Sequence, residues 1–206
     1  MKKYEYRDYD DYYDAQVSAN RKKIDKVWAV EGVIKQLAGY LESQIENIRF
    51  GICHGTRNGR EQLWFREALS ANVVGTEISP TASSFAHTIE WDFHNVKPEW
   101  VGNVDFIFSN SLDHSYDPEY CLDQWMSCLG RDGLCLIEWT EDDVENKRSD
   151  PFGANLEEYR SLIGGKYRLI DELFFDAEYI RESFLNDTNR EGLNFFVDRY
   201  YLVVAN

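Results

Sequence analysis

Apolar residues along the chain form two kinds of pattern, and these alternate. Short continuous apolar runs, such as those at 104–110 and 134–139, predict strands that are buried on both faces of a sheet. Longer segments carry apolar residues at spacings of three and four, which predicts helices with one side packed against a sheet. Strands and helices that alternate in this order indicate an α/β protein with a mainly parallel sheet.

The same pattern sets the expected elements. Strands are predicted over residues 48–53, 72–77, 87–89, 104–110 and 134–139, and helices over 19–46, 60–71, 117–129 and 155–163, with a short helix or irregular turn over 81–86. Two further long strands are predicted over 167–175 and 193–204. Because the polar segment between these two strands shows no good helical pattern, we expect an antiparallel pair at the edge of the sheet.

Length and composition favour one domain. The chain has 206 residues, of which 43% are hydrophobic, so it can bury a full core. No apolar run reaches the roughly 18 residues of a membrane span, and the first residues lead into a tyrosine-rich acidic segment rather than an apolar signal region. We therefore expect a cytoplasmic protein that does not enter a membrane.

The cysteines and histidines give no metal signature. Cys53, Cys121, Cys128 and Cys135 form no C-x-x-C pair, and we expect them to be reduced, buried thiols. None of the histidines is spaced from another ligand type as a zinc site requires. The sequence therefore predicts no metal.

The formal net charge is −15, and its distribution excludes one class of partner. Acidic and basic residues balance within positions 1–50, so the whole excess lies in 51–206. A nucleic-acid site needs a basic stripe, whereas the only basic cluster here is 21–23, which is more typical of a solvated helix face. We expect a small-molecule substrate and no nucleic-acid partner.

A glycine-containing turn links the first predicted strand to the next helix, over residues 50–59. A strand, such a turn and a helix place backbone N–H groups and a helix N-terminus beside a ligand. Glu77 ends the following strand about 20 positions later, where a carboxylate can bind both hydroxyls of a ribose. The pair predicts a nucleotide-like cofactor.

Further polar residues follow two other strands. Asp92 comes after the third predicted strand, and the segment 109–114 follows the fourth. Because ligands bind outside the carboxyl ends of parallel strands, these positions support one site at one edge of the sheet. Each of them taken alone also fits an ordinary turn or a surface carboxylate.

Over roughly 45–140, these motifs resemble the class I, Rossmann-like methyltransferases that use S-adenosyl-L-methionine. Residues 51–57 stand where that family carries D-x-G-x-G-x-G, and only Gly55 of the pattern is kept. In that family, the acidic residue at the position of Glu77 binds the ribose, and an acidic and an apolar residue at the positions of 90–93 lie near the adenine. The segment 105–118 resembles the family's fourth-strand motif, which borders both cofactor and substrate.

The resemblance implies a three-layer α/β/α Rossmann-like sandwich with a mostly parallel seven-stranded sheet and an antiparallel C-terminal strand. It implies one domain over 1–206, with an N-terminal flap and helix in 1–46 and the core in 47–206. The cofactor-binding residues that it implies are Cys53, His54, Gly55, Thr56, Arg57, Glu77, Ile78, Asp92, Phe93, Asn110 and Ser111.

Methyl transfer from a sulfonium needs positioning more than acid–base chemistry. Where the acceptor must lose a proton, His114 is the candidate base and Asp113 the candidate residue to orient it; a histidine that only packs the loop is the alternative. The flap at 4–14 and the acidic loop at 138–150 are expected to select the acceptor.

The sequence thus predicts methyl transfer to oxygen or nitrogen of a small polar metabolite such as a sugar. A non-catalytic Rossmann-like module that binds S-adenosylmethionine or a nucleotide remains the contrasting hypothesis. An NAD-dependent oxidoreductase is disfavoured, because the turn lacks the G-x-G-x-x-G spacing.

Overall fold

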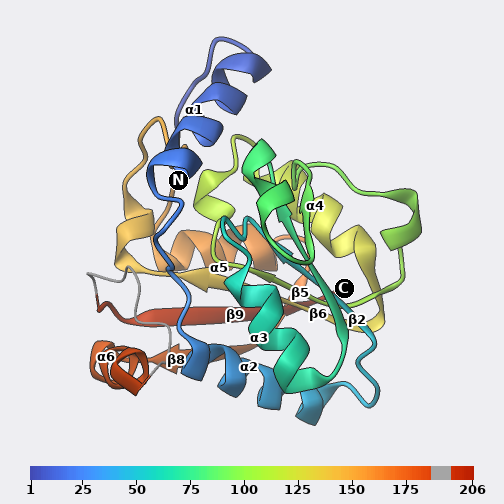
Figure 1. Ribbon diagram of the computed structural model, residues 1–206. Coiled ribbons are helices and arrows are strands. Elements are labelled where there is room, and N and C mark those ends of the chain that lie inside the picture. Colours follow the sequence, from blue (N-terminus) through green and yellow to red (C-terminus); the bar gives the residue numbers. More distant parts are fainter. Residues whose placement is uncertain (187–195) are drawn as a thin grey trace.

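A seven-stranded sheet runs through the computed structural model, which describes residues 1–186 and 196–206, and helices cover both of its faces (Figure 1). The strand order is β4-β3-β2-β5-β6-β9-β8. The strands are β2 (Phe50–His54), β3 (Asn72–Glu77), β4 (Thr88–Glu90), β5 (Val104–Ser109), β6 (Leu129–Trp139), β8 (Arg168–Phe175) and β9 (Arg199–Ala205). Neighbours from β4 to β6 pair in parallel, while β9 pairs antiparallel with both β6 and β8. The predicted α/β sandwich with an antiparallel C-terminal strand is confirmed.

Alternate residues of each central strand enter two different cores. On one face, α2 (Glu31–Gln44), α3 (Arg60–Leu69) and α6 (Ala177–Asn186) pack on side chains such as Phe106 and Phe108. On the other face, α4 (Pro118–Cys128) and α5 (Leu156–Gly164) pack on side chains such as Ile107. This two-sided burial explains why β5 is apolar without alternation.

The N-terminal region differs from the prediction of one helix over 19–46. It forms α1 (Tyr9–Lys22) and α2, with a break at 23–30. The side chain of Asp8 accepts a hydrogen bond from the backbone N–H of Asp11 and caps α1, which also carries acidic residues in its first turn and basic ones in its last. Residues 9–14 of the acidic tyrosine-rich segment that was expected to form a flap therefore belong to a helix, and residues 4–8 precede it.

The C-terminal region also differs in one respect. The two late strands pair antiparallel as predicted, but α6 lies between them, so the prediction of a connection without a helix was wrong. Ile180 of α6 is buried in the same core as α2. The predicted strand 193–204 begins at Arg199; its positions 193–195 lie outside the described residues.

Two smaller features complete the description. A two-stranded antiparallel sheet joins β1 (Lys2–Lys3) to β7 (Phe152–Gly153). The four cysteines are free and buried, as predicted. Among the described residues, no helix combines the length and the apolar character that crossing a membrane would need.

Gly51 in the middle of β2 occupies a position where no side chain fits. A Cβ atom built there would lie 2.2 Å from Cε1 of Phe106 on the neighbouring strand. The resembling family carries an acidic residue at this position, and here the aromatic ring takes its place.

We expect Gly51→Ala to lower the free energy of unfolding by about 1–3 kcal/mol, because the overpacked ring and strand must shift. The matched control is Gly39→Ala in α2, where a Cβ atom would meet nothing within 4 Å. There, the higher helix propensity of alanine should raise the free energy of unfolding by about 0.5–1 kcal/mol. Urea unfolding of both variants measures the difference, and equal stability of Gly51→Ala and the wild type would contradict the packing argument.

Candidate functional site

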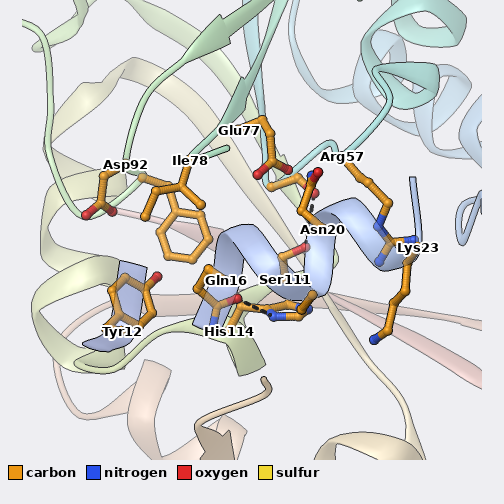
Figure 2. Close-up of a pocket in the computed structure, with 13 residues that line it drawn as sticks. Tyr12, Gln16, Asn20, Lys23, Arg57, Glu77, Ile78, Asp92, Ser111 and His114 are labelled. Atoms are coloured by element: carbon orange, nitrogen blue, oxygen red, sulfur yellow. Dashed lines mark hydrogen bonds between the residues drawn. The ribbon is translucent and has the colours of Figure 1, made fainter. Parts of the chain in front are cut away.

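Two adjoining cavities lie at the carboxyl ends of the parallel strands. The inner cavity, about 50 Å³, lies under α1, and the outer cavity, about 380 Å³, opens beside it. Both are lined by Gly55, Arg57, Ser111 and His114, so they form one continuous site. The predicted residues that line the inner cavity are Gly55, Arg57, Glu77, Ile78, Asp92, Phe93, Ser111 and His114, and most of them are visible in Figure 2. Asn110 and Asp113 line the outer cavity.

The glycine turn is held by β3. The backbone N–H groups of Gly55 and Thr56 both donate to the carbonyl oxygen of Thr76, at 2.9 and 3.1 Å. These two groups are therefore not free for a ligand, in contrast to what the turn pattern indicated. Gly55 has a φ of +75°, and a Cβ atom there would lie 2.6 Å from the side chain of Ser111, so glycine is needed for the conformation and for the close approach.

Three of the predicted residues place their side chains away from both cavities. Cys53 and Thr56 are buried, and His54 stacks on Trp125 with ring centroids 4.9 Å apart. Nδ1 of His54 lies 2.9 Å from the hydroxyl oxygen of Thr76. Burial lowers the pKa of His54 to about 3, so its ring is neutral and belongs to the core.

The two carboxylates that were expected beside the nucleoside do reach the inner cavity. Oε1 of Glu77 accepts a hydrogen bond from the N–H of Ser79 at 2.9 Å, and burial raises its pKa. Asp92 accepts hydrogen bonds from Nδ1 of His94 at 2.7 Å and from the hydroxyl of Tyr9 at 2.8 Å. Although burial opposes its ionisation, the hydrogen bonds from His94 and Tyr9 lower the pKa of Asp92. A negative charge is thus held in the inner cavity.

Helix α1 covers the inner cavity with side chains of which only Tyr12 belongs to the segment 4–14 that the sequence analysis connected with the site. Tyr12, Gln16 and Asn20 stand four positions apart on one face of this helix and line the cavity (Figure 2). Asn20 accepts a hydrogen bond from the hydroxyl of Thr81 at 2.8 Å, which ties α1 to the loop after β3. Their spacing of four residues could have shown that they share one face, but only if 9–22 had been predicted as a helix.

His114 is held in one tautomer. Its Nδ1 lies 2.8 Å from the carbonyl oxygen of Ser149 and 3.1 Å from Oε1 of Gln16. Both partners are acceptors, so Nδ1 carries the hydrogen of the neutral ring and Nε2 keeps its lone pair. Oδ2 of Asp113 lies 3.8 Å from Nε2, on the side of the outer cavity. His114 is therefore arranged as an acceptor of a proton.

Acidic side chains dominate the outer cavity. Glu138, at the end of β6, accepts hydrogen bonds from the indole of Trp28, from the hydroxyl of Tyr201 at 2.5 Å and from the buried guanidinium of Arg199 at 3.4 Å. Burial raises the pKa of both Asp113 and Asp143, so these two carboxyl groups ionise less readily than exposed ones.

One more carboxylate lies in the outer cavity, and no pattern in the sequence pointed to it. Glu61, in the first turn of α3, is 5% exposed. Its Oε1 lies 3.5 Å from Nδ2 of Asn110, and its Oε2 has no hydrogen-bond partner. Burial raises the pKa of Glu61 to about 7. In the sequence it looks like an ordinary acidic residue near a helix N-terminus.

A possible ligand set for a cation lies at the rim. Asp113, His114 and Asp150 each offer a ligand atom within 4.8 Å of the others. Nζ of Lys147 lies 2.5 Å from Oδ2 of Asp150, so an ammonium group already balances this carboxylate. The absence of a metal stays a prediction.

The raised pKa of Glu61 predicts how one variant responds to pH. Glu61 has a pKa of about 7 in the folded protein and an ordinary pKa of 4.5 in the unfolded chain. As the pH rises from 4.5 to 7, the unfolded chain loses this proton before the folded protein does, so the free energy of unfolding falls. We expect Glu61→Gln to raise the free energy of unfolding by about 2–3 kcal/mol at pH 8, with a gain that shrinks towards pH 5. The control, Glu67→Gln, removes an exposed carboxylate from the same helix and should change little. Urea unfolding at both pH values provides the measurement, and a gain that does not depend on pH would contradict the assignment.

Comparison with known proteins was made at the level of sequence and of structure. No protein-family model matches the sequence, and no curated protein sequence matches it.

Solved structures do match. The chain is similar to the Burkholderia thailandensis 1,6-didemethyltoxoflavin-N1-methyltransferase, solved with 1,6-didemethyltoxoflavin and S-adenosylhomocysteine, with a TM-score of 0.67 and 14% identity over 95% of this chain and 87% of that one. It is similar to the putative methyltransferase in a complex with the Haloferax volcanii Trm112 methyltransferase activator, with a TM-score of 0.62 and 16% identity over 98% and 99% of the two chains. It is also similar to the [4+2]-cyclase SpnF, with a TM-score of 0.57 and 11% identity over 82% and 79%. The chain therefore has the fold of the class I, Rossmann-like methyltransferases.

Proposed function

We propose that this protein binds S-adenosyl-L-methionine across the two cavities and transfers its methyl group to oxygen or nitrogen of a small polar acceptor. The observation that carries the proposal is the continuity of the site. The inner cavity beside Glu77 and Asp92 continues past Ser111 and His114 into a second cavity lined by polar groups. The similarity in fold to a methyltransferase solved with S-adenosylhomocysteine supports the same use of this sheet edge.

The residues of the inner cavity fit an adenosyl group. The carboxylate of Glu77 lines the inner cavity, where it can accept hydrogen bonds from ribose hydroxyls, and Ile78 and Phe93 offer apolar surface for a base. A cavity of about 50 Å³ holds only one or two water molecules. We therefore expect α1, which carries Tyr12 and Gln16, to move outward when the nucleoside enters.

The residues of the outer cavity fit a polar acceptor. When bound, S-adenosylmethionine supplies an electrophilic methyl group on its sulfonium. The protein orients the acceptor in line with that group and shields it from water. Nε2 of His114 takes the proton of an acceptor hydroxyl or amine as the new bond to carbon forms, and Asp113 lies close enough to stabilise the resulting imidazolium. The acidic walls favour a cationic or polyhydroxylated molecule.

Calorimetric titration with S-adenosylmethionine, S-adenosylhomocysteine and NAD tests the cofactor. We expect both adenosyl ligands to bind and NAD not to bind. Glu77→Gln should weaken the binding of S-adenosylhomocysteine by roughly 1–3 kcal/mol, because the amide is a poorer acceptor for the ribose hydroxyls. Glu67→Gln, an exposed change of the same charge, is the control. Binding of NAD alone would overturn the proposal.

A panel of small polar metabolites with labelled S-adenosylmethionine tests turnover. With an acceptor found in this way, His114→Asn should lower kcat by roughly 10²–10⁴. It should leave the affinity for S-adenosylhomocysteine within about threefold of the wild type, as judged by the same calorimetry. Tight binding without turnover on any acceptor would favour the non-catalytic module. Unchanged turnover in His114→Asn would assign His114 to packing alone.

A further inference from the structure

The outer cavity contains a buried carboxylate, that of Glu61, with one oxygen that has no hydrogen-bond partner among the described residues. Glu61 is 5% exposed, lines the outer cavity beside Gly55 and Arg57, and has an unpartnered Oε2. Leaving a buried polar atom without a partner costs free energy, so such an atom in a ligand cavity indicates a group that the ligand brings.

Two other buried carboxylates of the site already accept hydrogen bonds. Glu138 accepts from Trp28, Arg199 and Tyr201. Asp92 accepts from His94 and Tyr9.

Position 51 cannot supply a carboxylate either. It is a glycine, and a Cβ atom there would lie 2.2 Å from the ring of Phe106. Among the described residues that line the outer cavity, Glu61 and Asp150 each have a buried carboxylate oxygen without a hydrogen-bond partner. Oδ2 of Asp150 is already paired with Nζ of Lys147, whereas no described cation forms an ion pair with Glu61.

We propose that Glu61 binds the ammonium group of the methionine part of S-adenosylmethionine. This inference rests on the proposed cofactor. With the nucleoside in the inner cavity beside Glu77 and Asp92, the amino-acid end of the same ligand would extend past Gly55, which lines both cavities, into the outer cavity that Glu61 lines.

Arg57 lines both cavities and carries the complementary charge. Its Nη1 donates to the carbonyl oxygen of Lys26 at 3.1 Å, and a guanidinium has further N–H donors that can bind the carboxylate of the same amino acid. A zwitterionic head group between Glu61 and Arg57 satisfies both side chains at once.

The state of Glu61 in the free protein agrees with this role. Burial raises its pKa to about 7, with Arg57 as the cation that acts against the shift and Glu138 as an acid that adds to it. A bound ammonium would stabilise the ionised form, so the head group and the carboxylate favour each other's charge.

Two ligands separate the head group from the nucleoside. S-adenosylhomocysteine carries both parts, and 5′-deoxy-5′-methylthioadenosine carries the nucleoside without the amino acid. We expect Glu61→Gln to lower the affinity for S-adenosylhomocysteine at least tenfold and to leave the affinity for methylthioadenosine within twofold of the wild type. The control Glu67→Gln should change neither affinity. Equal losses on both ligands, or no loss on either, would overturn the assignment.

A third ligand isolates the ammonium. For an analogue of S-adenosylhomocysteine with a hydroxyl in place of the amino group, Glu61→Gln should lower the affinity less than threefold. A drop in affinity as large as that for S-adenosylhomocysteine would overturn the inference. Urea unfolding confirms that the variant is folded. If wild-type protein binds none of the three ligands, the proposed cofactor fails. If it binds them and Glu61→Gln binds them equally well, only this inference fails.

Discussion

A buried polar cluster joins the three parts of the chain that form the site. The guanidinium of Arg199, from the antiparallel strand β9, meets Glu138 at the end of β6 and donates to the carbonyl oxygen of Trp28 at 2.9 Å. Removing one member of such a pair leaves a buried charge unpaired, so the cluster fixes where the segment before α2 lies. That segment in turn receives the side chain of Asn58 from the glycine turn, through the carbonyl oxygens of Ile24 and Lys26.

The geometry of the ligand site follows from this anchoring. Because the segment 23–30 is pinned between β9 and the glycine turn, α1 is directed across the carboxyl edge of the sheet instead of continuing into α2 (Figure 1). The turn keeps its shape through Thr76 and Asn58, with both of its first N–H groups occupied. Recognition of a charged ligand therefore falls on side chains more than on the backbone.

The sequence predicted what depends on local pattern. Continuous apolar runs marked the central strands, and the polar residues that follow them marked the sheet edge. The break at 23–30 was missed because its apolar spacing continues that of a helix, while Trp28 is held by tertiary hydrogen bonds that no local rule contains. Helix α6 was missed because its burial on α2 rests on few residues, among them Ile180. Glu61 was missed because an acid in the first turn of a helix is common, and its burial depends on partners far away in the chain.

The close packing of Phe106 against Gly51 makes these two positions interdependent. A side chain at position 51 becomes possible only when the ring at position 106 shrinks, and the smaller residue alone would leave a void in the core. The effects of changes at the two sites are therefore expected to be non-additive. Single-residue steps in either direction are therefore expected to pass through a less stable protein.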